Sequence, residues 1–167
     1  MNLNKVTNKI KSVTNRIDFD KHFNWFIFKF TLIDKSTQLN NNKINNLHPI
    51  RPRKGDVYLI NFGRNIGNEL SDIHMGIIVQ SSLVNNFSST VIVIPISSST
   101  KLYAGHEKII ANDIQNGKLD KLPSKAKTEQ IMCIDKSRLV HKVAEMTPEF
   151  VIRLEKRLLK TLDIKSE

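Results

Sequence analysis

Polar and charged side chains gather between residues 54 and 99, where predicted loops meet the ends of apolar runs. The segment GRNIGNELSD joins the first two runs and contains two glycines, the cation Arg64 and the carboxylate Glu69. Glycine allows a loop to lie closely over a ligand, and loops held by a rigid sheet often carry binding residues. We therefore look for the chemistry of this protein at that loop and at the strand ends beside it.

The single cysteine narrows the possible chemistry. Cys133 cannot form an internal disulfide, and there is no cysteine cluster to bind a metal. It stands within the apolar run IMCI, which predicts a buried structural thiol rather than a nucleophile. Neither a Ser/His/Asp triad nor the spacing of a metal site emerges, so no metal or other cofactor is expected.

Three apolar runs predict the strands that position these residues. Residues 56–62 alternate between two faces, with Val57 on one face and Ile60 on the other. Residues 74–80 and 90–96 are almost continuously apolar, which is typical of strands that are covered on both faces.

The second half of the chain predicts more strands and a C-terminal helix. We expect a strand over 107–111, a tight turn at Asn116-Gly117, a short strand over 122–124, a longer strand over 127–134, and a turn at DKSRL. The helix begins at Thr147, because a capping hydroxyl there precedes Pro148. Its docking stripe is Val151, Leu154, Leu158 and Leu162, and its outward cations are Arg153, Lys156, Arg157 and Lys160.

The first 50 residues have a different character. Residues 1–20 are polar and basic, and they form an amphipathic helix or fray. The segment HFNWFIFKFTLID fits a helical face and also a strand alternation, and we favour the helix. Its apolar face would pack on the sheet or on a second subunit, or would contact a partner or a membrane surface. That face consists of Phe23, Phe26, Ile27, Phe30 and Ile33.

The aromatic segment is not a membrane anchor. It is too short to span a bilayer, is interrupted by Lys29 and lacks a cleavage pattern. The linker QLNNNKINNLHPIRPRK follows, with many asparagines and two prolines. The chain thus divides into an N-terminal helical extension with its linker, residues 1–50, and a globular domain, residues 51–167.

The overall charge favours a polyanionic partner. The 167 residues carry a net charge of +10, and 40% hydrophobic residues suffice for one core. Such a basic chain is typical of nucleic-acid binding. The alternative is that a composition rich in Lys, Asn and Ile reflects coding bias and a solvated surface.

Five ordered segments carry a family resemblance: GDVYLINF, GNEL, the run from His74 to Gln80, TVIVIPIS and EQIMCIDKSRL. Over about residues 51–164 they resemble the MazF/PemK toxin family of type II toxin-antitoxin systems. The resemblance implies a mainly β fold, a small curved antiparallel barrel-like sheet of the MazF/CcdB type with the EQI segment in its last strand, and a C-terminal helix. It also implies a cytoplasmic, metal-independent endoribonuclease that cuts single-stranded RNA, forms a homodimer and is inhibited by a cognate antitoxin.

The resemblance also assigns site residues. Family members place an Arg and then a Pro at the start of the second strand, where this chain has His74 and Met75. Ser97 matches a hydroxyl near the scissile phosphate, and Glu69 matches a loop carboxylate. Cleavage needs a base for the 2′-OH, an acid for the 5′-oxygen and donors for the charged phosphorane. A histidine, with a reference pKa of about 6.5, supplies acid and base near neutrality but clamps phosphate less well than Arg. The missing positive charge would come from Arg64, Lys101 and Arg53.

Each assignment has an alternative. His74 is an ordinary strand-end residue if this member has lost activity, Ser97 lies in a serine run, and Glu69 only caps its loop. His106 is a second candidate for the cleft, although a lone histidine is more often structural.

Three other functions remain open. CcdB-like toxins share this fold and bind DNA gyrase. An inactive homologue would bind RNA or an antitoxin without cleavage. The N-terminal aromatic segment would instead make the sheet a scaffold for a protein interaction.

Overall fold

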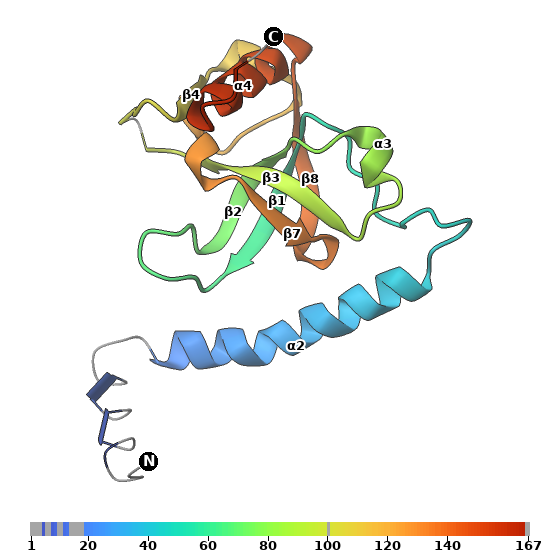
Figure 1. Cartoon of the computed structure of the whole chain (residues 1–167), viewed down its shortest axis with the longest axis vertical. Helices are drawn as coiled ribbons and strands as arrows, with labels where there is room; N and C mark the ends of the chain where they lie inside the picture. The colour runs from blue at the N-terminus through green and yellow to red at the C-terminus, as the bar shows by residue number, and fades with distance from the viewer. Residues whose placement is uncertain (1–4, 6–7, 10–11, 14–18, 100, 166–167) are drawn as a thin grey trace.

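The structure is a computed structural model that describes residues 5, 8–9, 12–13, 19–99 and 101–165. The helix expected over residues 1–20 falls mostly outside these residues. A long helix lies beneath a curved sheet, and a shorter helix covers the opposite end of the domain (Figure 1). No helix in the described part of the chain is long and apolar enough to cross a membrane.

The elements follow one another in a simple order. The strands are β1 (Asp56–Gly63), β2 (Asp72–Ile78), β3 (Thr90–Ser97), β4 (His106–Ile109), β5 (Ile114–Gly117), β6 (Ser124–Lys127), β7 (Met132–Asp135) and β8 (Leu139–Met146). The helices are α2 (Phe19–Asn41), α3 (Ser82–Asn85) and α4 (Pro148–Thr161), with short 3-10 turns η1 (Ala111–Asp113), η2 (Thr128–Gln130) and η3 (Lys136–Arg138). The strands form one antiparallel sheet in the order β4-β6-β3-β2-β1-β8-β5, with β7 also on β3. The predicted mainly β fold with a C-terminal and an N-terminal helix is confirmed.

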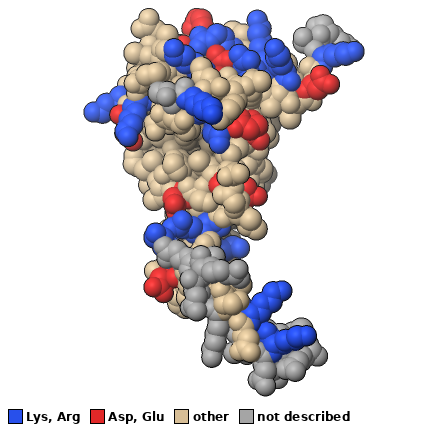
Figure 2. All heavy atoms as spheres, turned by 90° about the vertical axis from the view of Figure 1, so that its left-hand side faces the viewer, with Lys and Arg blue, Asp and Glu red and all other residues tan. Residues whose placement is uncertain are grey.

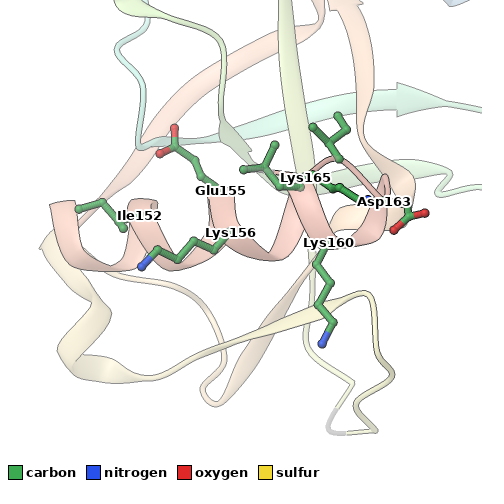
Figure 3. A pocket seen from close by; sticks show the side chains of 8 residues that line it. Ile152, Glu155, Lys156, Lys160, Asp163 and Lys165 are labelled. Atoms are coloured by element: carbon green, nitrogen blue, oxygen red, sulfur yellow. The ribbon is translucent and has the colours of Figure 1, made fainter. Parts of the chain in front are cut away.

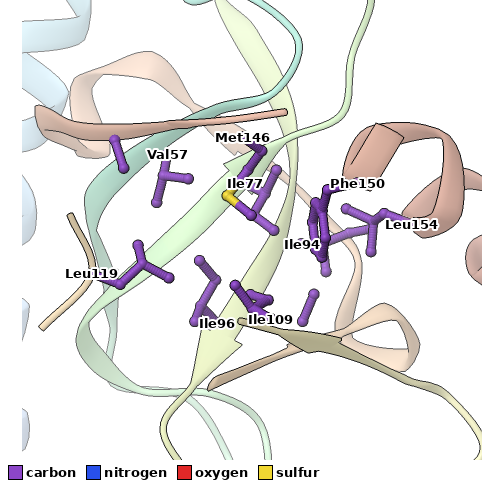
Figure 4. Close-up of a cluster of buried hydrophobic side chains, with 11 residues drawn as sticks. Val57, Ile77, Ile94, Ile96, Ile109, Leu119, Met146, Phe150 and Leu154 are labelled. Carbon is purple, nitrogen blue, oxygen red and sulfur yellow. The ribbon is translucent and has the colours of Figure 1, made fainter. Parts of the chain in front are cut away.

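Two apolar clusters cover the two faces of the central strands. Val57, Ile77 and Ile94 lie in the first cluster, which also receives Phe150 and Leu154 from α4 (Figure 4). The other face carries the second cluster, which includes Ile60, Phe62, Ile78, Val91, Val93, Ile134 and Leu139. The predicted alternation of residues 56–62 is therefore correct.

Helix α4 begins as predicted, since the Thr147 hydroxyl accepts a hydrogen bond from the Phe150 amide at 3.2 Å. Two expectations about its faces are wrong. Leu162 lies beyond the helix and is half exposed, so it does not dock. Arg153 and Arg157 do not simply face solvent, because both pair with Glu107 of β4.

Strand β8 was not predicted, and the strands before it are shorter than expected. Within the expected strand over 127–134, residues 128–130 form η2, Lys127 ends β6 and only the end of the range belongs to β7, so the EQI segment is not the last strand. Asn116-Gly117 is not a hairpin turn but the end of β5. Bulges in the pairing of β8 with β1 interrupt the two-residue period, which is why the sequence hides this strand.

Cys133 is exposed rather than buried. It lies on β7, which pairs with β3 through Ile92 opposite Cys133. Because only one face of β7 packs on the second cluster, Ile134 is buried and the thiol on the other face meets solvent.

The N-terminal segment forms the predicted helix, α2, which lies against the domain through one side. Trp25 stacks on the Arg138 guanidinium at 5.5 Å, and a Cβ at Gly63 would meet the Trp25 ring at 2.2 Å. Lys35 donates hydrogen bonds to the carbonyls of Ser137 and Leu139. The prediction that the phenylalanine face packs on the sheet is wrong, since those rings are exposed on the other side.

The linker begins later than expected and is docked on the domain. Gln38–Asn41 belong to α2, and the His48 amide donates to the carbonyl of Asn86 at 2.7 Å. The His48 side chain is almost fully buried, and this burial lowers its pKa.

Lys136 is completely buried at the start of η3. Its ammonium donates hydrogen bonds to the carbonyls of Asn85 and Ser88 at 2.5 and 2.6 Å. Burial lowers the pKa of Lys136 to about 8, with help from the positive charge of Lys43 and against the attraction of Asp135. This one side chain thus holds the segment after α3 to the end of β7.

The Lys136→Met variant is expected to be less stable by about 1–3 kcal/mol at pH 7, because two buried carbonyls lose their donor. Between pH 8 and 10.5 the unfolded chain binds a proton at Lys136 that the native chain lacks, so the lysine's contribution to stability rises with pH. Urea unfolding at several pH values measures both effects, with Lys118→Met, at an exposed lysine, as control. A stability difference between wild type and Lys136→Met that stays constant across this window would contradict the assignment.

Candidate functional site

His74 and Ser97 stand at corresponding positions of two neighbouring strands. The β2–β3 pairs end at Gly76 opposite Pro95, and the same register carried two residues further sets His74 across from Ser97. The intermediate residues agree with this register, since Met75 and Ile96 both pack in the first cluster. Residues directly opposite in an antiparallel pair share a face, so the histidine and the hydroxyl belong to the same face of the sheet.

The surroundings of His74 are open on one side and packed on the other. His74 is exposed and pairs on β1 with the buried Ile60. A Cβ at Gly76, two residues along the same face, would meet Ile60 at 2.7 Å, so the small residue leaves room for the apolar floor. The imidazole therefore stands at the rim of the second cluster with access to solvent.

Strand β3 changes partner along one edge before Ile96. Along this edge it pairs first with β7 and then, at Ile96 and Ser97, with β6. Ser97 is opposite Lys125, whose ammonium donates a hydrogen bond to the carbonyl of Lys101. The β3–β6 register thus places Lys125 beside the predicted hydroxyl of Ser97. The sequence alone did not single out this lysine.

Glu69 lies in the loop between β1 and β2, and its carboxylate makes a local contact. Its Oε2 accepts a hydrogen bond from the Ile66 amide at 3.2 Å. The loop is also tied to η2, because the Gln130 side chain donates to the Asn68 carbonyl at 3.1 Å. This contact corresponds to the loop-capping alternative considered for Glu69.

The three predicted cations have different positions. Arg64 forms an ion pair with Asp72 at 3.2 Å, at the end of β2 that carries His74. Lys101 lies in the loop that follows Ser97. Arg53 lies at the opposite end of β2, since the neighbouring Gly55 amide bonds to the Ile78 carbonyl. The structure does not bring Arg53 to the other candidates.

Sequence reasoning missed an aromatic residue between two lysines. The Tyr103 ring lies 5.3 Å from the Lys101 ammonium and 5.7 Å from the Lys125 ammonium. It is 59% exposed, which leaves a ring face for a ligand. Lys101 and Tyr103 are close in sequence, whereas Lys125 reaches them because β6 pairs with both β3 and β4, the strands on either side of that loop.

His106 has a positioning role. Its Nδ1 accepts the Tyr103 amide hydrogen at 3.0 Å, so Nε2 carries the proton and donates to Glu129 at 3.1 Å. The side chain is almost fully buried, and its ring contacts the Tyr103 ring edge-on. His106 therefore fixes the loop that carries Tyr103, and a cavity of about 490 Å³ opens between this loop and the end of α4.

The β1–β2 loop and the loop between β3 and β4 project from the same side of the domain, the left side of Figure 1. In Figure 2, which faces that side, Lys and Arg gather over the upper part of the domain above a broad uncharged surface. A further hollow of about 700 Å³ follows the outer side of α4, lined by Lys156, Lys160 and Lys165 among others (Figure 3). None of the predicted site residues lines that hollow.

The described residues contain no group of three or more His, Cys, Asp or Glu side chains arranged to hold a metal ion. The chemistry on this side of the sheet consists of an exposed imidazole, a hydroxyl, an aromatic ring and several cations. That combination suits a negatively charged substrate that carries aromatic groups.

Comparison with solved structures supports the fold. The crystal structure of MazF (Form-I) from Deinococcus radiodurans has a TM-score of 0.56 at 16% identity, covering 68% of this chain and 98% of that chain. An endoribonuclease in complex with its cognate antitoxin from a mycobacterial species has a TM-score of 0.54 at 17% identity, covering 70% and 99%. A MazE-MazF complex (Form-II) from Deinococcus radiodurans has a TM-score of 0.55 at 16% identity, covering 70% and 99%.

The sequence itself matches one family. A comparison with curated proteins gives no match. The profile of the PemK-like, MazF-like toxins of type II toxin-antitoxin systems matches residues 53–162, about two-thirds of the chain, and confirms the resemblance carried by the five ordered segments. The chain therefore belongs to the PemK-like, MazF-like toxin family of type II toxin-antitoxin systems.

Proposed function

We propose that this toxin is an endoribonuclease that cleaves single-stranded RNA without a metal ion. The observation that supports the proposal is the β2–β3 pairing, whose register, extended two residues past its last pair at Gly76 and Pro95, would set His74 across from Ser97. The loop after Ser97 adds Lys101 and Tyr103, and Lys125 of β6 lies near the Tyr103 ring. The solved relatives described as endoribonucleases share the fold, which is consistent with this activity.

His74 acts as the acid and base. The neutral imidazole takes the proton of the 2′-OH, the 2′-oxygen attacks phosphorus, and the bond from phosphorus to the 5′-oxygen breaks. The imidazolium formed in the first step returns the proton to the leaving 5′-oxygen. The products are a 2′,3′-cyclic phosphate, or its hydrolysed form, and a 5′-hydroxyl.

Ser97 and the nearby cations stabilise the charged phosphorane. The Ser97 hydroxyl donates to a phosphate oxygen, and Lys101 supplies positive charge from the adjoining loop. The buried Lys125, opposite Ser97, holds that loop through its hydrogen bond to the Lys101 carbonyl. Arg64 joins them when the substrate phosphate competes with Asp72 for the guanidinium. Glu69 assists by holding the β1–β2 loop in place rather than by proton transfer.

Tyr103 selects single-stranded RNA. A base stacks on an exposed ring only when it is free of a duplex, and the flanking Lys101 contacts the phosphate backbone. The His106–Glu129 pair holds Tyr103 in position for that contact.

We further propose that the toxin binds a cognate antitoxin and acts as a homodimer in the cytoplasm. Two of the solved relatives are complexes of a toxin with an antitoxin, which supports the first part. The basic surface favours an acidic antitoxin segment that competes with RNA.

A second function, RNA binding without cleavage, is favoured by one observation. Arg64 is paired with Asp72, so the guanidinium nearest to His74 in the β1–β2 region is partly neutralised. An inactive member would bind RNA in a salt-dependent way and release no fragments.

The His74→Ala variant should lose at least about 100-fold of the cleavage rate, because general acid–base catalysis contributes about 10²–10⁴-fold. The test is purified toxin on end-labelled single-stranded RNA, with His141→Ala as control at an exposed histidine of β8. EDTA should not change the rate, and new RNA ends should accept phosphate from polynucleotide kinase without prior dephosphorylation. Cleavage by His74→Ala at the unmutated rate would exclude His74, and absence of cleavage by the wild type would favour the binding function.

The Tyr103→Ala variant should raise KM for single-stranded RNA about 5- to 150-fold, since one base stack is worth about 1–3 kcal/mol. Tyr103→Phe keeps the ring and should retain most of the affinity. Lys101→Gln should weaken binding at low salt and reduce the slope of log Kd against log salt by about one. Equal KM values for Tyr103→Ala and wild type would remove Tyr103 from the substrate path.

A further inference from the structure

The side of α2 that faces away from the domain is an exposed apolar stripe. Four phenylalanines and one isoleucine form it, and each is about half exposed. The stripe consists of Phe19, Phe23, Phe26, Phe30 and Ile33. Neighbouring rings already touch along it, with Phe19 on Phe23 and Phe26 on Phe30.

The opposite side of α2 is the one that docks. The less exposed residues of the helix are Trp25, Leu32, Lys35, Ser36 and Leu39. Trp25, Lys35 and Ser36 contact the domain. Figure 1 shows the helix lying beneath the domain with its lower side uncovered. Since a helix turns 100° per residue, the phenylalanines of the stripe face away from the domain. Ile33, at the edge of the stripe, borders a hollow of about 240 Å³ that α2 forms with Asp135, Ser137 and Arg138.

The spacing of the stripe fits a partner helix. Its residues are separated by four, three, four and three positions, which is the a/d repeat of a coiled coil. An apolar face for a lipid surface has no need of this period, because a wide face of any spacing would serve. The pattern therefore indicates knobs-into-holes packing against another helix.

The flanking charges complement a second copy of the same helix. With Phe23 and Phe30 at a positions, Lys29 occupies a g position and Asp34 the following e position. In a parallel pair, g of one helix faces this e of the other, so two Lys29–Asp34 pairs would form across the twofold axis. An antiparallel pair would instead bring e positions together, and these include the like charges Asp20 and Asp34.

The size of the stripe is sufficient for a reversible contact. Half of each phenylalanine's roughly 150–250 Å² would leave solvent, which gives about 400–500 Å² per chain from the stripe alone. Ile27 is half exposed beside the stripe, and with the stems of the flanking residues the area approaches the lower limit of about 600 Å² per partner for a specific interface. The stripe lies outside residues 53–162, so this contact is an addition to the family domain.

We propose that two copies of this chain pair through their α2 helices, in parallel and in register, with the stripe as the seam. The pairing needs only the extension, and it holds whether or not the domain cleaves RNA. It places the two toxin domains on opposite sides of the helix pair, because each domain occupies the docked side of its own α2.

Sedimentation velocity of the full chain at micromolar concentration tests the pairing. The Phe26→Glu/Phe30→Glu variant should have no more than half of the weight-average mass of the wild type. Leu83→Glu/Phe87→Glu is the matched control, since it places the same charges on two exposed apolar residues of the α3 region and should keep the wild-type mass. Lys29→Glu alone and Asp34→Lys alone should lower the mass, and the double exchange should restore it.

Oxidative cross-linking tests the register. In a Cys133→Ser chain, Ile33→Cys should form a disulfide-linked dimer, because a parallel pair brings the two copies of residue 33 together. Thr31→Cys, exposed on α2 but off the stripe, should remain uncoupled. A weight-average mass of Phe26→Glu/Phe30→Glu equal to that of the wild type overturns the proposal. This holds even if the variant loses binding to anionic vesicles or to an antitoxin, because the stripe would then serve a different partner. Equal cross-linking at residues 31 and 33 also overturns the proposal.

Discussion

The register between β2 and β3 is the constraint on which the rest of the structure depends. Their pairing ends at Gly76 and Pro95, and beyond that point β3 takes β6 as its partner on the other edge. A shift of one residue would turn every side chain of β2 to the other face, which would move Ile77 out of the first cluster and turn His74 toward it. Since both faces are filled by apolar clusters, the register is specified by the core and not by the site. The positions of His74 and Ser97 are thus a consequence of core packing a few residues further along the same strands.

The N-terminal extension depends on the domain in a different way. Helix α2 is held by a few strong contacts at one side, among them Trp25 on Arg138 and over Gly63, where no side chain would fit. The linker after it is held at His48 and, through the segment after α3, by the buried Lys136. These contacts orient the phenylalanine stripe away from the domain, which makes the extension an interaction element rather than part of the core.

Much of the fold follows from local sequence patterns, and less of the site does. The runs at 56–62, 74–80 and 90–96 and the Thr147 cap were sufficient to predict three strands and a helix, because packing on both faces and capping act over short distances. Strand β8 was hidden because its bulges break the two-residue period. The burial of Cys133 was predicted wrongly because an apolar run does not reveal that its strand is covered on one face only. The proximity of Lys125 to Tyr103 became visible only in the folded sheet, because β6 pairs with both β3 and β4 and so brings together segments that are distant in sequence.

The most direct test of the central claim is a crystal structure of the toxin with a single-stranded RNA whose 2′-hydroxyl at the cleavage position is methylated. We expect the scissile phosphate to lie between His74 and Ser97, with the imidazole within hydrogen-bonding distance of the 2′-oxygen and a base stacked on Tyr103. A phosphate bound elsewhere, for example in the lysine-lined hollow along α4, or a His74 ring that makes no contact with the RNA, would contradict it.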